Sequence, residues 1–272
     1  MAEQPPPRLV ATDLDGTLVH SDGRVTPRTR EVLAGLDRLG VPVVAVTARP
    51  MRWMDDLWPI LGRSGFGVVS NGAIVYDVAR GAPARVTGIE APSGLAMAES
   101  IRAQVPDVTF ALECVSGIKR DPRYVEPHPV PAGSPVAELP ELWTEPAVKV
   151  MVRCASMEFP ELLERVTRAV GDLGTVSWTI TGLVEIGPPG VTKASTLALV
   201  ARDLGVDAAE VVAFGDMPND IPMLVWAGTA FAMANAHPSV LAVADHVAPG
   251  NDEDGVAETL ARLFGLRPGC DP

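Results

Sequence analysis

The chain has 272 residues, of which 47% are hydrophobic and 21% are charged, so it can bury the core of one large domain or of two modest ones. Its formal net charge is −12 and it contains no basic run, so we expect neither a nucleic acid nor a membrane surface as a partner. An acidic chain also repels a phosphate ester, so a phosphate site in it needs a local cation, either a metal or a placed Lys or Arg.

The cysteine usage and the first residues bear on the compartment. Cys114, Cys154 and Cys270 lie far apart with no C-x-x-C pair, which argues against a disulfide scaffold or a zinc site and indicates a reducing environment. The start of the chain has no basic-then-apolar signal peptide, and no apolar run approaches the length of a membrane span. We therefore expect a cytoplasmic protein, whose oligomeric state nothing in the sequence predicts.

The first eighty residues alternate short apolar runs with helical patterns. Strands are predicted at residues 9–11, 41–46 and 67–69, and helices over residues 26–40 and from Pro50 through Leu61. Thr26 and Pro27 have the residue types of a helix N-cap and first helical position. Nearly continuous apolar strands that alternate with helices predict a Rossmann-like α/β core, a parallel sheet with helices on both faces.

The alternation of apolar strands and helical patterns ends near Gly81. Up to about Gly190 the sequence is rich in proline, with predicted strands over 148–152 and 175–186, a helix over 161–170 and a loop over 121–146. After Thr192 this alternation resumes, with strands at 211–214 and 230–233 and helices to Leu204, over 221–226 and to Phe264. We predict a core made of residues 1–82 and 189–272 and an inserted α+β cap over residues 83–188.

The most informative stretch is Asp13-Leu14-Asp15-Gly16-Thr17-Leu18, which directly follows the first predicted strand. Of two carboxylates one residue apart, the first can act as a nucleophile and the second as an acid and base. Gly16 allows the backbone to turn sharply and to bring amide N–H groups close to an anion. The alternative interpretation is an ordinary strand-to-loop turn rich in Asp and Gly.

Further polar residues follow the neighbouring strands. Thr47 ends the second strand, Gly215-Asp216-Met217-Pro218-Asn219-Asp220 follows the strand at 211–214, and Lys193 opens the helix before that strand. Ligands of an open parallel sheet bind beyond the carboxyl ends of its strands, so we expect these groups to meet. Three carboxylates, a hydroxyl and an ammonium can together hold Mg²⁺ and a phosphoryl group.

Each of these residues also has a simpler interpretation when it is taken alone. Thr47 fits a helix N-cap, and Lys193 and Arg49 fit solvated surface charges. Asp216 and Asp220 fit a favourable contact with the dipole of the helix that follows them. Only the joint placement of these residues at neighbouring strand ends favours a site.

The motifs resemble those of a known family. Asp13 to Leu18, Thr47-Ala48-Arg49, Lys193 and Gly215 to Asp220 are similar to the four ordered motifs of the haloacid dehalogenase superfamily. Three further segments resemble the Cof-type branch of this superfamily: Asn71-Gly72-Ala73, Gly190-Val191-Thr192-Lys193 and Asn251-Asp252-Glu253-Asp254-Gly255-Val256. That branch carries a large α+β cap after the third core strand. The resemblance covers about residues 8–80 and 190–264, and over the cap it rests on position and size.

The resemblance implies a role for each site residue. Asp13 would be the nucleophile that becomes an aspartyl-phosphate, and Asp15 would protonate the leaving oxygen and then activate water. The implied ligands of Mg²⁺ are the Asp13 carboxylate, the Asp15 main-chain oxygen and Asp216. Thr47 and Lys193 would hold the phosphoryl group, and the implied supporting residues are Asn71, Asn219, Asp220 and Asn251, with Asp220 orienting Lys193 or supporting the metal ligands. Ala48 departs from the glycine common in the branch.

The sequence thus predicts an Mg²⁺-dependent phosphatase that acts on a small phosphate ester such as a sugar phosphate. Two alternatives remain open. The same nucleophile serves a phosphosugar mutase or phosphotransferase, in which a second hydroxyl replaces water. A phosphate-ligand sensor without catalysis would be expected to have lost Asp13 or Asp15, and both are present.

Overall fold

The computed structural model describes residues 7–266, and its central strand, β1 (Leu9–Thr12), is completely buried. β1 lies inside an eight-stranded sheet of order β13-β12-β11-β1-β2-β3-β4-β5. Its other strands are β2 (Val43–Val46), β3 (Phe66–Val69), β4 (Ile74–Asp77), β5 (Ala82–Val86), β11 (Val211–Gly215), β12 (Thr229–Met233) and β13 (His246–Ala248). Strands buried on both faces explain why their sequences are apolar without alternation.

The pairing of this sheet places the candidate residues at one edge. β1 pairs in parallel with β11 on one side and with β2 on the other, and only the β3–β4 hairpin is antiparallel among the registers described here. The carboxyl ends of β1, β2 and β11 are therefore adjacent. Asp13, Thr47 and Asp216 each follow one of these ends directly.

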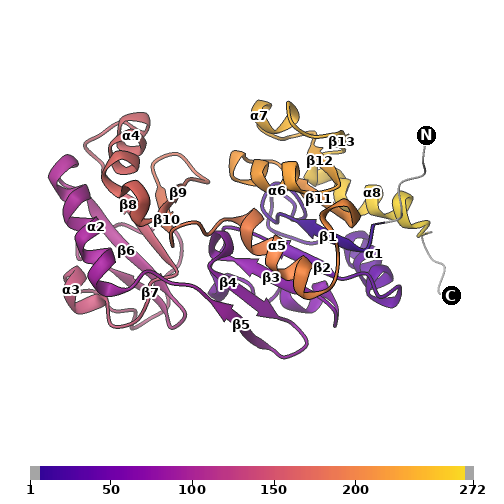
Figure 1. Cartoon of the computed structure of the whole chain (residues 1–272), viewed down its shortest axis with the longest axis horizontal. Coiled ribbons are helices and arrows are strands. Elements are labelled where there is room, and N and C mark those ends of the chain that lie inside the picture. The colour runs from indigo at the N-terminus through magenta and orange to yellow at the C-terminus, as the bar shows by residue number, and fades with distance from the viewer. Residues whose placement is uncertain (1–6, 267–272) are drawn as a thin grey trace. The chain divides into compact units, whose positions relative to one another are not determined.

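Helices cover both faces of the large sheet (Figure 1). They are α1 (Pro27–Arg38), α5 (Lys193–Asp203), α6 (Ile221–Trp226), α7 (Pro238–Leu241) and α8 (Gly255–Phe264). α1 packs against α8, and α5 packs against α6. As the sequence predicts, Thr26 caps α1, where its Oγ1 accepts a hydrogen bond from the Thr29 N–H at 3.0 Å, and Pro27 is the first helical residue.

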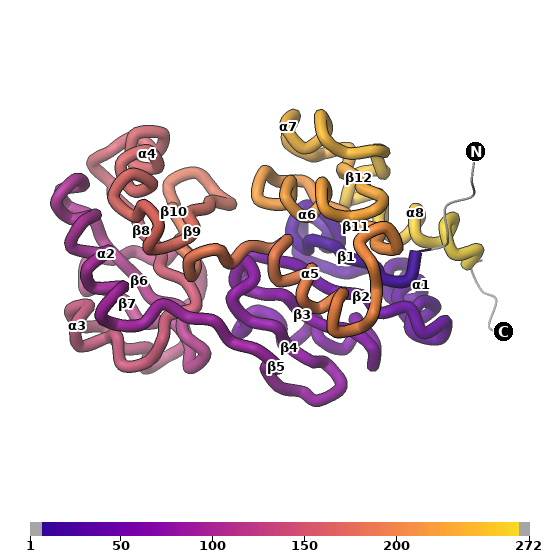
Figure 2. Tube along the Cα trace, viewed as in Figure 1, coloured from indigo at the N-terminus to yellow at the C-terminus, as the bar shows by residue number. Residues whose placement is uncertain are grey.

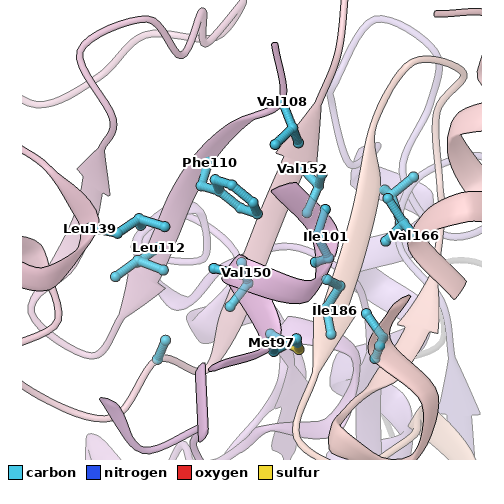
Figure 3. Close-up of a cluster of buried hydrophobic side chains, with 14 of the residues drawn as sticks. Met97, Ile101, Val108, Phe110, Leu112, Leu139, Val150, Val152, Val166 and Ile186 are labelled. Carbon is cyan, nitrogen blue, oxygen red and sulfur yellow. The ribbon is translucent and has the colours of Figure 1, made fainter. Parts of the chain in front are cut away.

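A second sheet of five strands has the order β7-β6-β8-β10-β9 and is covered by helices on one face. Its elements are α2 (Ala91–Gln104), β6 (Thr109–Cys114), β7 (Gly117–Arg120), α3 (Leu139–Leu142), β8 (Lys149–Arg153), α4 (Phe159–Val170), β9 (Thr175–Ser177) and β10 (Val184–Gly187). Figure 3 shows part of the core beneath the helices, where Met97 of α2 lies beside Val150 of β8. Trp143 packs against Gly94 so closely that an added Cβ would lie 2.0 Å from the indole.

The contacts divide the chain into two units. One consists of residues 7–49, Trp53–Arg85 and 193–266, and the other of Pro50–Arg52 and Val86–Thr192. Figure 2 shows the chain leaving the first unit after β5 and returning to it at α5. The second unit thus begins at Val86 and not before it, because β5 still belongs to the large sheet.

The structure corrects several of the predicted elements, and the expected loop over 121–146 contains the short helix α3. The expected helix from Pro50 through Leu61 is wrong, because this segment forms only two short 3₁₀ turns, Met51–Trp53 and Trp58–Leu61. Pro59 lacks the N–H that a continuous helix would need. Helix α2 and the β6–β7 hairpin are present where the sequence analysis made no prediction.

None of the helices within residues 7–266 has the length and apolar character that a membrane span requires. Cys114 and Cys154 are buried and free, and Cys270 lies outside the described residues.

Candidate active site

A buried lysine joins two carboxylates at the centre of the candidate site. Lys193 Nζ lies 2.9 Å from Asp13 Oδ1 and 2.6 Å from Asp220 Oδ1. Lys193 is 2% exposed and Asp220 is 0% exposed, so the interpretation of Lys193 as a solvated surface residue is wrong. The other oxygen of Asp220 accepts the N–H groups of Asp216 and Met217, each at 3.0 Å. Asp220 thus orients Lys193 and also fixes the backbone of Asp216.

The third carboxylate, Asp216, packs against the turn that follows β1. Its Oδ1 accepts a hydrogen bond from Thr17 Oγ1 at 2.8 Å. Gly16 has φ of +75°, and a Cβ at this position would lie 2.4 Å from Asp216 Oδ2. The turn therefore needs glycine both for its left-handed backbone and for the space that the carboxylate occupies.

The donor atoms fit a hard divalent cation. One ligand oxygen each from Asp13, Asp216 and Asp220 lie within 4.8 Å of one another. Asp220 already accepts hydrogen bonds on both oxygens, whereas Asp13 Oδ2 and Asp216 Oδ2 accept none from the residues the structure describes. Carboxylate oxygens are among the ligands that Mg²⁺ prefers, so the free oxygens of Asp13 and Asp216 suit such an ion.

The pKa values at this site reflect an excess of buried negative charge. Burial raises the pKa of Asp13 well above its usual range, an effect that Asp220 and Asp216 increase and Lys193 opposes. Burial also raises the pKa of Asp216 to about 6, although the Thr17 hydrogen bond lowers it. Burial alone would lower the Lys193 pKa, but the attraction of Asp13 and Asp220 outweighs it, and the net shift is upward. The ammonium stays charged, and a further cation would relieve the remaining repulsion.

The loop after β2 brings an arginine to the second carboxylate of the hexapeptide. Arg49 Nε donates to Asp15 Oδ2 at 2.7 Å and Arg49 Nη2 donates to Asp15 Oδ1 at 2.5 Å. The hydrogen bond and charge of Asp15 raise the pKa of Arg49. Asp15 is 61% exposed and Arg49 only 18% exposed in their side chains, so a half-buried guanidinium holds a solvent-facing carboxylate. The interpretation of Arg49 as a surface charge missed this pairing.

Thr47 stabilises the turn after β2 and does not cap a helix. Its Oγ1 accepts the Arg49 N–H at 3.0 Å, and no α-helix begins there. The next loop, Ser70–Gly72, holds this turn from the other side, because Ser70 N–H donates to the Arg49 carbonyl oxygen at 2.9 Å and Asn71 N–H to that of Thr47 at 3.1 Å. The buried Thr47 side chain thus lies in a turn whose backbone is braced by a second loop.

The Ser70–Gly72 loop is strained and tied to the strand end at β11. Ser70 and Asn71 have φ of 52° and 55°, which is unusual for residues other than glycine. Asn219 Nδ2 donates to Asn71 Oδ1 at 3.4 Å. Ser70 Oγ and Asn219 Oδ1 are buried without a hydrogen-bond partner among residues 7–266. Backbone strain and unpaired buried polar atoms of this kind cluster at functional sites.

Asn251, near the C-terminal end of the described chain, holds the loop that follows β1. Its Nδ2 donates to the Val19 carbonyl oxygen at 3.0 Å, and its side chain is buried. Nearby, Asn235 Nδ2 donates to the Gly16 carbonyl oxygen at 2.8 Å. Sequence reasoning missed Asn235, because a lone asparagine after a strand carries no pattern that separates it from a turn residue.

The chain is similar in sequence to known proteins. The family model described as haloacid dehalogenase-like hydrolase matches residues 10–260. The HMP-PP phosphatase of Serratia proteamaculans is 30% identical over 244 residues, covering 86% of each chain. The phosphoglycolate phosphatase of Methanothermobacter thermautotrophicus is 24% identical over 258 residues, covering 95% of this chain and 99% of the relative.

A solved structure supports the fold. BT1666 from Bacteroides thetaiotaomicron, a phosphatase of the haloalkanoate superfamily, superimposes with a TM-score of 0.82, covering 96% of each chain at 24% identity. A family match over nearly the whole described chain, with the ordered motifs gathered at three adjacent strand ends, leads to one conclusion. The chain belongs to the haloacid dehalogenase-like hydrolases, in their Cof-type branch.

Proposed function

We propose that the chain is an Mg²⁺-dependent phosphatase that hydrolyses a small phosphate ester, with sugar phosphates as the first class to test. The observation that carries this proposal is the bridge from Lys193 to Asp13 and Asp220 beside the carboxylate of Asp216. It supplies a nucleophile, a fixed positive charge and a set of oxygen ligands at one strand edge. Catalysis of phosphoryl transfer depends mainly on such positioning of the reacting groups and on neutralisation of their charge.

In the proposed reaction, a carboxylate oxygen of Asp13 attacks phosphorus and the bond from phosphorus to the ester oxygen breaks. Asp15 donates a proton to that leaving oxygen, and in the second half it takes a proton from the water that releases phosphate from Asp13. Lys193 and Thr47 hold the phosphoryl oxygens. Mg²⁺, held by Asp13, Asp216 and the Asp15 main-chain oxygen, would supply charge that offsets the repulsion between the carboxylates and the phosphate.

We also propose that residues 83–188 act as a cap that selects the substrate. The support is the position of this unit as an insertion between β5 and α5, with a sheet and a hydrophobic core of its own. The core residues would then set the chemistry and the inserted unit the preference among esters. The cytoplasmic location stays a prediction from the sequence.

The test is a panel of phosphate esters incubated with the purified chain and Mg²⁺, with released phosphate as the readout. We expect turnover with at least one ester, its loss on chelation and its recovery with Mg²⁺ but only poor recovery with Ca²⁺, which prefers more ligands and looser geometry. Asp13→Asn should keep the fold and lose turnover. Release of phosphate that survives both chelation and Asp13→Asn would contradict the proposal.

Product analysis separates the main alternative. A phosphosugar mutase or phosphotransferase would use the same Asp13 chemistry but would pass the phosphoryl group to a hydroxyl, so phosphorylated product would form in place of free phosphate.

A further inference from the structure

Two asparagine side chains hold the turn that follows the proposed nucleophile. Asn235, in the loop between β12 and α7, donates from Nδ2 to the Gly16 carbonyl oxygen at 2.8 Å. Its Oδ1 accepts the N–H of Asn251 at 3.0 Å, and Asn251 Nδ2 donates to the Val19 carbonyl oxygen at 3.0 Å. The turn after β1 is thus connected by these amide groups to two segments near the other end of the chain, at Asn235 and Asn251.

The chemistry of the relay suits asparagine. The amide group of Asn235 faces a carbonyl with its NH₂ and a backbone N–H with its oxygen, so a single orientation satisfies both contacts. An aspartate of the same shape would keep the acceptor but would set a carboxylate oxygen against the Gly16 carbonyl. Alanine would remove both contacts.

The carbonyl that Asn235 holds belongs to the peptide between Gly16 and Thr17. Gly16 follows Asp15 directly, and Thr17 donates its hydroxyl to Asp216. The N–H of the same peptide, that of Thr17, donates to the Leu14 carbonyl oxygen at 3.2 Å, so Asn235 supplies the second hydrogen bond of this peptide, the one at its carbonyl end. The same loop also reaches Asp216 itself, because the His237 N–H donates to the Asp216 carbonyl oxygen at 2.8 Å.

From this placement we infer that Asn235 is a positioning residue for the Asp15–Thr17 turn. By fixing the Gly16 carbonyl, it sets the direction in which Asp15 leaves the backbone and the place of the Thr17 hydroxyl against Asp216. The inference rests on the proposed phosphatase function, and it deepens that function by adding a residue outside the motifs. Asn235 acts through the turn and is not assigned a contact with substrate.

The experiment compares Asn235→Ala and Asn235→Asp with the wild type and with Ser239→Ala as the matched control. Ser239 lies near Asn235 and its hydroxyl contacts His237, but it makes no hydrogen bond to the turn. The two substrates are p-nitrophenyl phosphate, whose leaving group needs little protonation, and an alkyl phosphate, whose leaving group needs it. We expect kcat on the alkyl phosphate to fall about tenfold or more in both Asn235 variants, because a misplaced acid loses proton transfer. On p-nitrophenyl phosphate the fall should be clearly smaller, and Ser239→Ala should match the wild type.

A second readout needs no turnover. The Mg²⁺-induced rise in melting temperature, measured without substrate, should be smaller in both Asn235 variants than in Ser239→Ala, because the turn carries the Asp15 main-chain oxygen and the Thr17 contact to Asp216.

The outcomes separate this inference from the proposed function. If the wild type is active and both Asn235 variants match Ser239→Ala on both substrates, the inference is wrong and the proposed function stands. Equal losses on both substrates with a lower melting temperature before Mg²⁺ is added would also overturn it, since they indicate general destabilisation. If the wild type releases no phosphate from any ester, the proposed function fails. The Mg²⁺-induced rise in melting temperature then tests the role of Asn235 by itself. A rise that is absent in the wild type, or unchanged in the Asn235 variants, overturns the inference as well.

Discussion

Arg49 clasps Asp15 through two hydrogen bonds, one to each carboxylate oxygen. The backbone of Arg49 is held on both sides, because its N–H donates to Thr47 Oγ1 and its carbonyl oxygen accepts a hydrogen bond from the Ser70 N–H. The proposed acid is therefore aimed by a residue two positions beyond the proposed phosphate-binding threonine. Such fork-to-carboxylate pairing carries geometric information that a single contact lacks.

We predict that Arg49→Ala lowers kcat about tenfold, because Asp15 loses the partner that orients it. Arg49→Lys should recover little of this loss, since an ammonium cannot make the paired contact. Steady-state phosphate release measures both. Arg24→Ala, which breaks the exposed contact with Asp22, is the control and should leave kcat unchanged. Full activity in Arg49→Ala would remove the residue from the positioning of Asp15.

Variants of Lys193, Asp220 and Asp216 should differ in their effect on turnover. Lys193→Ala removes the cation between two buried carboxylates, so we expect kcat to fall at least about a hundredfold, as when a preorganised charged donor is removed. Asp220→Asn should be milder than Asp216→Asn, because Asp220 supports the lysine and backbone whereas Asp216 is a proposed metal ligand. Parallel melting curves and phosphate assays on the three variants provide the comparison. A greater loss in Asp220→Asn would reverse the assigned roles.

Gly16→Ala tests the packing between the first turn and Asp216. The new Cβ would lie 2.4 Å from Asp216 Oδ2 in a backbone at φ +75°, so the carboxylate must move. Gly81→Ala is the matched control, because Gly81 has φ of +63° and nothing within 4 Å of an added Cβ. Both should lose roughly 1 kcal/mol of unfolding free energy to backbone strain. Only Gly16→Ala should also weaken the Mg²⁺-induced rise in melting temperature, and equal Mg²⁺ responses in the two variants would contradict this.

A buried ion pair in the second sheet predicts an asymmetric effect on stability. Lys149 binds Glu185, both side chains are buried, and Lys149 also attracts Glu113. Lys149→Met should therefore cost about 3–5 kcal/mol of unfolding free energy, because it strands buried negative charge. Glu185→Gln should cost less, since Lys149 keeps Glu113 as a neighbour.

Urea denaturation measures these changes in the unfolding free energy. Arg168→Ala, at an exposed pair with Glu164 on α4, should change it by less than about 1 kcal/mol and serves as the control. Equal costs for Lys149→Met and Glu185→Gln would show that Glu113 gives the lysine no support.

The sequence predicts β1, β2, β3, β11 and β12 because each is a short apolar run, and it predicts Asp13, Thr47 and Asp216 as site residues because each directly follows such a strand. It does not predict β4, β5 or β13, which are partly or largely exposed. Helix α2 escapes prediction because Pro92 and Gly94 interrupt its pattern, although both lie in the first turn, where they are tolerated. The contacts from Arg49 to Asp15 and from Asn235 to Gly16 also escape it. They join loops of different strands, and only the folded sheet brings those loops together.

The pairing of Leu9 in β1 with Val211 in β11 has a consequence for the order of folding. The central strand cannot gain its second neighbour until most of the chain has been synthesised, because the partner lies far along the sequence. The smaller unit, by contrast, draws almost all its residues from the continuous segment Val86–Thr192. Distant pairings are slow to form because loop closure costs entropy before the contacts can compensate. During synthesis, a nascent chain that has not reached β11 therefore carries Asp13 on a half-built sheet, without Asp216 or Asp220, and gains its phosphate chemistry only when the last strands arrive.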